Sequence, residues 1–383
     1  MTPHAEPSRE APAPMTALLR TAPAPAVEAD RFPYRLSRLG VVMSPEEGNP
    51  HEVEGVLNPG SGRTPDGRLH LLPRLVAAGN VSRIGLAEVV LTDGVPTGVR
   101  RDGLLMEPDR SWERGVGHGG VEDPRVTFVA ALGLHVMTYV AYGPLGPRTA
   151  VATSSDLRTW TRLGPVLYGY DDALDCDLNL YPNKDTTFFP EPVTAPDGTP
   201  SLAVLHRPMW DLGEMVPGEG DQPPTGLPDD RGSIWIAFVP LAEARADVRA
   251  LVHWRQHRFV AGPEHPFEEL KIGGGPAPLR VPEGWLLLHH GVTGELVRAF
   301  AQQKKVHYAA GGMILHAERP WEVVLRTSTP LLEAVTAEER SGIVPNVVFP
   351  TAIETVDDVH YVFYGMADSK IGVARLDRTA DPA

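Results

Sequence analysis

The sequence contains very little cysteine. Its 383 residues include one, Cys176. A single cysteine excludes an internal disulfide and a metal site built from several cysteines. Nothing in the cysteine usage therefore suggests redox chemistry.

Cationic residues are also in short supply. The chain has 35 lysines and arginines against 49 aspartates and glutamates, which gives a formal net charge of −14. Such a chain repels nucleic acids and anionic membranes at long range, so neither is expected as a partner. A local basic pocket for one small anion remains compatible with this balance.

Long apolar runs are absent as well. No run approaches the roughly 18 apolar residues of a membrane helix, and the first 15 residues, MTPHAEPSREAPAPM, lack the apolar core of a signal peptide. A cytoplasmic protein is expected. Residues 1–30 are rich in Ala, Pro and Glu without periodicity, which predicts a disordered lead-in. We expect a single domain over 31–376 and a short tail over 377–383.

Proline and glycine, in contrast, are abundant and spread along the chain, with 39 and 38 residues. This punctuation favours many short strands over long helices. Five strand-like runs resemble one another: HLLPRL (70–75), LHVMTYVAY (134–142), LAVLHRP (202–208), WLLLHHGV (285–292) and VHYVFYGMAD (359–368). Each is followed by a second run with small residues, at 82–89, 148–156, 232–241, 310–318 and 369–376. Five strand pairs indicate five sheets.

A third run precedes each pair, and each begins with a polar motif containing Gly or Pro. Meander sheets packed radially around an axis give this pattern, so the sequence predicts an all-β, five-bladed β-propeller. Only seven residues follow Leu376, so we expect an N-terminal strand over 34–43 to complete the last blade and hide both sheet edges. Helices are expected to be few and short, at 241–252 and 336–342.

In a propeller, the starts of the innermost strands face one cleft, so motifs far apart in sequence become neighbours. The polar candidates are Asn58 and Arg74, Asp123 and Arg125, Lys184, Asp185 and Arg207, Lys271 and His290, and Asn346 and Asp368. The EDPR motif at 122–125 puts two carboxylates before a buried strand. An acidic residue before Pro is also an ordinary turn opener, so this motif alone does not distinguish a site from a turn.

Nine motifs occur in order between about residues 50 and 376: VLNPG, LLPRL with SRIGLAEV, GVEDPR, RTAVATSSDLRTWTRLGP, NKDTTFFPE, LHRP, KIGGGPAPLRVPEGWLLLHHGV, VPNVVFPTA and YGMADSKIGVA. This set closely resembles glycoside hydrolase family 130. The resemblance implies a five-bladed propeller and an enzyme that acts on β-mannosides. The family groups inverting β-mannoside phosphorylases with some β-mannosidases.

The resemblance also implies roles for individual residues. Asp123 matches the family's general acid, which the resemblance implies protonates the glycosidic oxygen through a sugar hydroxyl. The residues that match phosphate-binding positions are Lys184, Arg207, Lys271 and His290. The residues expected to contact the substrate are Asn58, Arg74, Glu122, Arg125, Asp185 and Asp368. Lys184 stands where some members have Arg, and His289 stands where an aromatic residue is common.

These roles carry physical requirements. Asp123 must hold a proton near neutral pH, for which Glu122 as an anionic neighbour and exclusion of water would help. Phosphate must be held by cations in line with the anomeric carbon. Inorganic phosphate is then a co-substrate, and no cofactor is expected. No metal is expected either, because His118, Glu122 and Asp123 lack regular ligand spacing.

Two alternatives remain at this stage. An inverting β-mannosidase would need a carboxylate base that activates water, and Glu191, Asp175 and Asp177 are candidates. A catalytically silent sugar-binding propeller is the other. The leading hypothesis is an inverting phosphorylase that cleaves a β-linked manno-oligosaccharide to give α-mannose 1-phosphate. The sequence leaves the linkage, the acceptor sugar and a homo-oligomeric state open, and we expect the loop at 209–232 to cap the cleft.

Overall fold

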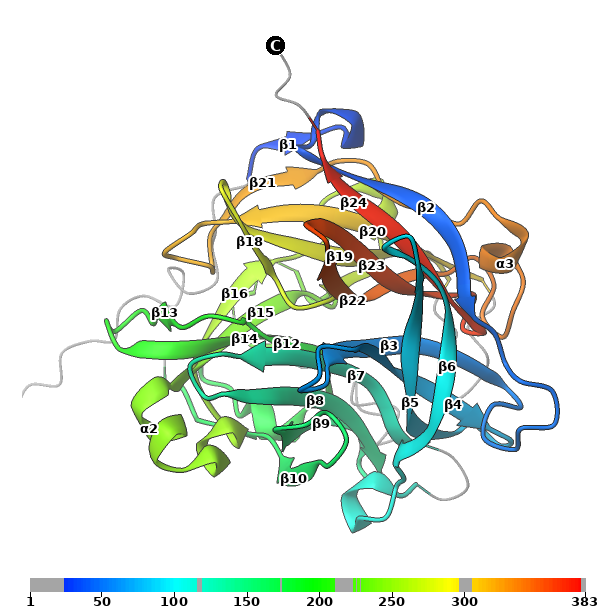
Figure 1. The fold of residues 1–383 in the computed structure, drawn as a ribbon. Helices are drawn as coiled ribbons and strands as arrows, with labels where there is room; N and C mark the ends of the chain where they lie inside the picture. The colour runs from blue at the N-terminus through cyan, green and yellow to red at the C-terminus, as the bar shows by residue number, and fades with distance from the viewer. Residues whose placement is uncertain are drawn as a thin grey trace, which may run out of the picture.

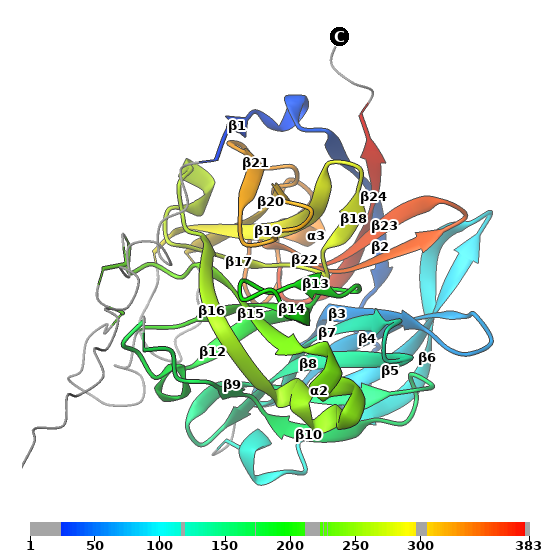
Figure 2. The same cartoon turned by 90° about the vertical axis from the view of Figure 1, so that its left-hand side faces the viewer.

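Successive antiparallel sheets surround one axis in the computed structural model of the protein, which describes residues 24–115, 119–172, 174–210, 223–224, 226–227, 229–295 and 305–379. The sheets form the predicted five-bladed β-propeller (Figure 1). They follow one another in chain order, and the second view shows the same succession from the side (Figure 2). No helix in the described ranges is long and apolar enough to span a membrane.

Blades 1 and 2 each contain four antiparallel strands. Blade 1 comprises β3 (Gly55–Arg63), β4 (Leu69–Ala77), β5 (Val81–Thr92) and β6 (Val95–Met106). Blade 2 comprises β7 (Gly119–Val129), β8 (Leu134–Gly143), β9 (Gly146–Ser154) and β10 (Thr161–Pro165). A short parallel contact between β5 and β7 joins the two blades into one eight-stranded sheet.

Blades 3 to 5 repeat the arrangement, with short additional strands. Blade 3 comprises β12 (Asn183–Phe188), β14 (Pro200–Pro208), β15 (Ile234–Pro240) and β16 (His253–Ala261), with β11 (Leu167–Tyr168) and β13 (Val193–Thr194) at its margins. Blade 4 comprises β17 (Lys271–Gly274), β19 (Gly284–Gly294), β20 (Val306–Leu315) and β21 (Val323–Thr327), with β18 (Leu279–Val281) and β1 (Ala26–Val27). Blade 5 comprises β22 (Val348–Val356), β23 (Val359–Met366), β24 (Lys370–Arg378) and β2 (Tyr34–Met43).

The helices are short, as the sequence predicts. They are α2 (Leu241–Ala246), α3 (Ala337–Arg340) and the 3-10 turns η1 (Ala29–Arg31), η2 (Ser111–Glu113), η3 (Leu178–Leu180), η4 (Val248–Val252) and η5 (Pro266–Glu268). All ten predicted strand runs coincide with the second and third strands of the blades. The apolar faces of these strands pack between neighbouring blades, and Trp235, Trp254 and Trp285 are fully buried there.

The N-terminal strand closes the ring as predicted. β2 pairs antiparallel with β24 from Tyr34 opposite Arg378 to Met43 opposite Ile371, so the blue and red strands lie side by side (Figure 1). The predicted lead-in is too long, because Ala26 and Val27 already pair with β21. Residues 1–23 lie outside the described residues. The predicted tail also begins too early, because β24 continues to Arg378.

A buried glutamate precedes the inner strand of four blades, each with an exposed fraction of 1% or less. These glutamates are Glu52, Glu113, Glu268 and Glu339. Each binds an arginine from the outermost strand of its own blade: Arg101 at 2.7 Å, Arg162 at 2.9 Å, Arg326 at 2.8 Å and Arg38 at 2.8 Å. The glutamate carboxylates also accept backbone N–H groups from the preceding turn. The pair thus ties the turn before the inner strand to the outer edge of the same blade.

Second-strand side chains complete the pair in three blades. The Tyr139 hydroxyl donates to Glu113 at 2.7 Å, the Tyr364 hydroxyl donates to Glu339 at 3.1 Å, and His289 Nε2 lies 2.8 Å from Glu268. His289, which the sequence marks as a departure from the family pattern, therefore packs inside blade 4. It is fully buried and does not face the axis cavity.

Blade 3 has histidines in place of this cluster. His206 and His257 are both buried, and their ring nitrogens lie 3.4 Å apart. Asn183 Nδ2 lies 3.0 Å from His206 Nδ1, and Asn183 Oδ1 accepts the backbone N–H of Arg207. Burial lowers the pKa of both histidines, that of His257 to about 4. Both rings are therefore neutral at pH 7.

A substitution in the Arg38–Glu339 pair tests whether the buried glutamates stabilise the closed ring of blades. We expect Arg38→Met to lower the free energy of unfolding by about 1–3 kcal/mol, because Glu339 keeps its other hydrogen bonds but loses its cation. The matched control is Arg35→Met on the same strand, where Arg35 is exposed, and it should stay within about 0.5 kcal/mol. Urea unfolding measures both, and equal losses would contradict the assignment.

The histidine pair predicts acid sensitivity. In the unfolded chain, a histidine has its ordinary pKa of about 6.5. Because folding lowers the pKa of His257 to about 4, its stabilising contribution is complete above pH 6.5 and is lost as the pH falls towards 4. We expect His257→Gln to flatten the fall in unfolding free energy between pH 6.5 and 4.5. His253→Gln, an exposed position on the same strand, should leave the slope unchanged; identical slopes in all three proteins would refute this.

Candidate active site

Bulges in the inner strands aim polar side chains at the axis. The pairing register shifts after Leu57 in β3, after Glu122 in β7 and after Lys184 in β12. At these shifts Asn58, Asp123 and Asp185 adopt left-handed backbone conformations, with φ of 43°, 47° and 53°. Asn and Asp tolerate this region better than other non-glycine residues, and a bulge redirects the side chain it carries. Proline follows Asn58 and Asp123, and it needs no N–H partner in a disrupted ladder.

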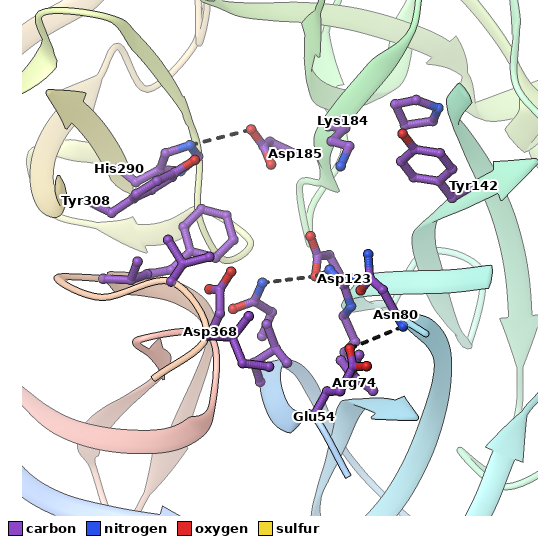
Figure 3. A pocket seen from close by; sticks show the side chains of 18 of the residues that line it. Glu54, Arg74, Asn80, Asp123, Tyr142, Lys184, Asp185, His290, Tyr308 and Asp368 are labelled. Carbon is purple, nitrogen blue, oxygen red and sulfur yellow. Dashed lines mark hydrogen bonds and ion pairs between the residues drawn. The ribbon is translucent and has the colours of Figure 1, made fainter. Parts of the chain in front are cut away.

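The five blades enclose one cavity of about 540 Å³ at these strand starts. The predicted site residues that line it are Asn58, Arg74, Asp123, Lys184, Asp185, Arg207, Lys271, His290 and Asp368. Figure 3 shows Asp123, Asp368, Lys184 and His290 arranged around the open centre. The structure thus brings together side chains more than 300 residues apart in sequence.

Asp123 is held by donors on one side of this cavity. Its Oδ1 accepts Asn58 Nδ2 at 2.9 Å and Arg74 NH1 at 3.1 Å. Arg74 also donates to Glu122 at 2.9 Å, so one guanidinium bridges both carboxylates of the EDPR motif. This fixed geometry leaves the rest of the Asp123 carboxylate directed into the cavity (Figure 3).

The expected effect of Glu122 on Asp123 is wrong. Burial raises the pKa of Asp123, but Arg74, Lys184 and Arg125 outweigh it and hold that pKa below its ordinary value. The Glu122 carboxylate is itself paired with cations, because it accepts a hydrogen bond from Arg74 and lies 3.7 Å from Lys184 Nζ. Asp123 is therefore ionised in the ligand-free protein.

Three cations line the same cavity. Arg207 Nε donates to Asp185 at 2.6 Å, and Lys184 Nζ lies 5.5 Å from the centre of the Tyr142 ring. Lys271 Nζ lies 5.7 Å from the centre of the Tyr308 ring. Arg207 and Lys184 are adjacent because their residues pair directly across β12 and β14. These side chains form a cationic pocket, defined by Lys184, Arg207 and Lys271.

His290 adjoins the cationic pocket but is not one of its charges. Its Nε2 lies 3.6 Å from Asp185 Oδ2, and its side chain is 1% exposed. Burial, helped by Arg207 and Lys271, lowers the pKa of His290 well below its ordinary value despite the attraction of Asp185. The ring is therefore neutral at pH 7 and can serve as a hydrogen-bonding group for an anion.

Glu122 and Arg125 differ from the predicted substrate contacts, because neither lines the cavity. Both side chains are buried. Arg125 donates to the backbone carbonyls of Gly275 at 3.0 Å and Asp123 at 3.2 Å, and its guanidinium lies over the Phe349 ring. These two residues support the lining from behind.

The three candidate bases for hydrolysis do not meet at the site, because none of Glu191, Asp175 and Asp177 lines the cavity. Glu191 is exposed beyond β12, and Asp175 is exposed and accepts the Tyr170 hydroxyl. Asp177 caps η3 through the backbone N–H of Asn179. Among the described residues, the carboxylates that do line the cavity are Glu54, Asp123, Asp185 and Asp368.

Sequence reasoning missed several lining residues. Tyr308 on β20 stacks on His290 with ring centres 5.7 Å apart, and Phe349 contacts the same ring edge-on at 4.4 Å. Glu54 and Asn80 line the cavity on the blade 1 side (Figure 3), where Glu54 accepts the backbone N–H groups of Gly79 and Asn80. The predicted Asn346 is not a lining residue, but its neighbours Val344 and Val347 are.

Two further expectations concern segments that are only partly described. Of the loop at 209–232, residues 211–222, 225 and 228 lie outside the described residues, so its capping role stays a prediction. His118 also lies outside them. In the ranges that the structure covers, no group of three or more His, Cys, Asp or Glu side chains could hold a metal ion.

Comparison with known proteins identifies relatives over most of the chain. A family profile described as beta-1,4-mannooligosaccharide phosphorylase matches residues 34–191 and 240–380. The chain is 30% identical to the 1,2-beta-oligomannan phosphorylase of Thermoanaerobacter sp. (strain X514) over 354 residues, 90% of this chain and 96% of the relative. It is also 30% identical to the beta-1,2-mannobiose phosphorylase of the same organism, over 71% of this chain and 69% of the relative.

Solved structures share the fold. The beta-1,2-mannobiose phosphorylase of Listeria innocua, solved with beta-1,2-mannobiose, matches with a TM-score of 0.65 and 21% identity, covering 90% of this chain and 96% of that one. The predicted propeller and the predicted family agree with these findings. The chain belongs to glycoside hydrolase family 130.

Proposed function

We propose that the protein is an inverting β-mannoside phosphorylase that uses inorganic phosphate to release α-mannose 1-phosphate. The observation that carries this proposal is that one cavity holds both a candidate acid and a cluster of cations. Asp123 and the cationic pocket of Lys184, Arg207 and Lys271 line the same cavity. Such a pocket holds a phosphate dianion beside the anomeric carbon of a bound sugar. Relatives named as mannoside phosphorylases support the same activity.

The reaction uses both the candidate acid and the cationic pocket. A phosphate oxygen attacks the anomeric carbon from the face opposite the leaving oxygen, and the bond from that carbon to the glycosidic oxygen breaks. The electron pair of this bond goes to the glycosidic oxygen, which receives the proton of Asp123 by way of a sugar hydroxyl. Attack from the opposite face inverts the anomeric centre and gives the α-phosphate. Asp123 ends the cycle as a carboxylate, the form that it has in the ligand-free protein, so it must gain a proton when the substrates bind.

We further propose that the scissile linkage is β-1,2. Both Thermoanaerobacter relatives and the Listeria innocua relative, 28% identical over 66% of this chain, carry β-1,2-linked substrates in their names. The relative named for β-1,4-mannooligosaccharides matches 32% of this chain. Phosphate is the co-substrate in this proposal, and no step needs a cofactor.

Substrate assays test the proposal directly. β-1,2-, β-1,3- and β-1,4-mannobiose are incubated with the protein, each with and without phosphate. We expect mannose 1-phosphate from β-1,2-mannobiose in the presence of phosphate and no cleavage without it. Free mannose formed at the same rate without phosphate would identify a hydrolase, and binding without turnover would identify a silent sugar-binding protein.

Asp123 provides the mutational test. We expect Asp123→Asn to lower kcat by at least about 10²-fold, because general acid catalysis typically contributes that much or more. The thermal midpoint should change little, because Asn keeps the size of Asp and tolerates the left-handed conformation. The matched control is Asp175→Asn, an exposed aspartate with φ of 44° away from the cavity, which should retain full activity. An active Asp123→Asn protein would refute the acid assignment.

A further inference from the structure

Asp368 differs from the other carboxylates around the cationic pocket. Glu122 and Asp123 bind Arg74, and Asp185 binds Arg207. Asp368 lines the same cavity from the turn between β23 and β24, with a left-handed φ of 49°. Among the described residues its carboxyl group makes no hydrogen bond and no ion pair. A carboxylate held in a cavity without a direct cation tends to take up a proton.

The surroundings of Asp368 include charges of both signs from several blades. Arg74 on β4 and Lys184 on β12 favour its ionised form, whereas Asp123 and Glu122 on β7 oppose it. Tyr308 on β20 faces Asp368 and stays protonated, because burial and Asp368 raise its pKa. Burial is the largest influence, and together with the two carboxylates it raises the pKa of Asp368 to about 6. Asp123 and Asp368 therefore differ in the direction of their pKa shifts.

Charge balance shows what an anion would do here. The described residues at and directly behind the cationic pocket supply five positive charges, on Arg74, Arg125, Lys184, Arg207 and Lys271. The carboxylates at the same cavity are Glu54, Glu122, Asp123, Asp185 and Asp368, and His290 is neutral. A bound dianion therefore turns a nearly balanced cavity negative. Uptake of one proton relieves this. The proton falls on Asp368, because Glu54 accepts two backbone N–H groups and the other three carboxylates bind arginines.

We propose that Asp368 takes up one proton when a phosphate dianion enters the cationic pocket, and that Asp368 and Asp123 then titrate as a coupled pair. The inference rests on the proposed function, because it assumes the pocket binds phosphate. Proton uptake on phosphate binding provides the proton that general acid catalysis needs, because Asp123 is ionised in the ligand-free protein. Asp368 is thus a proton-holding residue, and phosphate affinity and protonation are linked.

Sulfate is the probe that separates the protein's proton from those of the ligand. It remains a dianion between pH 5 and 8, whereas phosphate itself titrates there. Calorimetry of sulfate binding at pH 7, in buffers of different ionisation heat, gives the number of protons taken up. For the wild-type protein we expect roughly 0.5–1 proton per sulfate. The sulfate dissociation constant should rise with pH above 6, by at most about tenfold per unit.

Variants locate the proton. Asp368→Asn should bind sulfate at least as tightly, with uptake below about 0.2 proton and little pH dependence, because the carboxylate is gone. The matched control Glu54→Gln, another carboxylate on the cavity wall, should keep the wild-type uptake. His290→Gln should also keep it. Uptake that persists in Asp368→Asn and disappears in His290→Gln would overturn the inference, because the histidine would then be the acceptor.

Sulfate binding to the wild-type protein tests the role of Asp368 separately from the phosphate pocket. Sulfate binding without proton uptake and with a constant affinity from pH 6 to 8 overturns the role of Asp368 and leaves the phosphate pocket intact. Failure to bind either sulfate or phosphate overturns both, since the proposed function itself requires the pocket. Neither result depends on whether a variant folds.

Discussion

The buried glutamate–arginine pair is the interaction on which the site depends. Several residues of the site, Asn58, Asp123, Lys184, Asp185 and Lys271, lie in the first halves of inner strands, and these strands follow loops with little regular structure. Glu52, Glu113, Glu268 and Glu339 fix the turns that lead into four of these strands by binding an arginine of the same blade. Buried ion pairs add little net stability compared with apolar packing, but breaking one is costly. Their use here is to specify one arrangement of each turn.

The same logic explains the strained backbone of the inner strands. A regular strand alternates its side chains between two faces and would not direct neighbouring polar groups at the axis. The bulges at Asn58, Asp123 and Asp185 break this alternation, at a cost of about 1–3 kcal/mol for each left-handed residue. The blades around them supply that free energy through packing, so fold and site cannot be separated in these strands.

Much of the fold could be predicted from the sequence because its signals are local. Strand runs, their threefold grouping and the missing last strand depend on patterns within about ten residues, and the structure contains them all. The buried pairs were missed because their partners lie far apart, as with Glu339 and Arg38, and no local pattern links them. The early start of the domain was missed because β1 is two residues long.

The residues near the site were easier to predict than their orientation and their electrostatic surroundings. The lining residues follow from motifs, but Glu122 and Arg125 could not be separated from them, since a bulge decides which neighbour faces the cavity. The direction of the pKa shift of Asp123 also could not be derived. It depends on Arg74, Lys184 and Arg125, which belong to three strands, and their combined effect exceeds that of the adjacent Glu122. Tyr308 lacks a motif altogether.

The charges of the cavity connect the choice of nucleophile to the acid. The cations that would hold phosphate are the ones that keep Asp123 ionised when the cavity holds no anion. A water molecule in the same position carries no charge to offset these cations. Asp123 would then stay ionised and have no proton to donate. A dianion offsets them and allows the carboxyl pair to gain its proton. Under the proposed coupling, phosphate is therefore both the nucleophile and the condition for acid catalysis, which disfavours hydrolysis without any steric barrier to water.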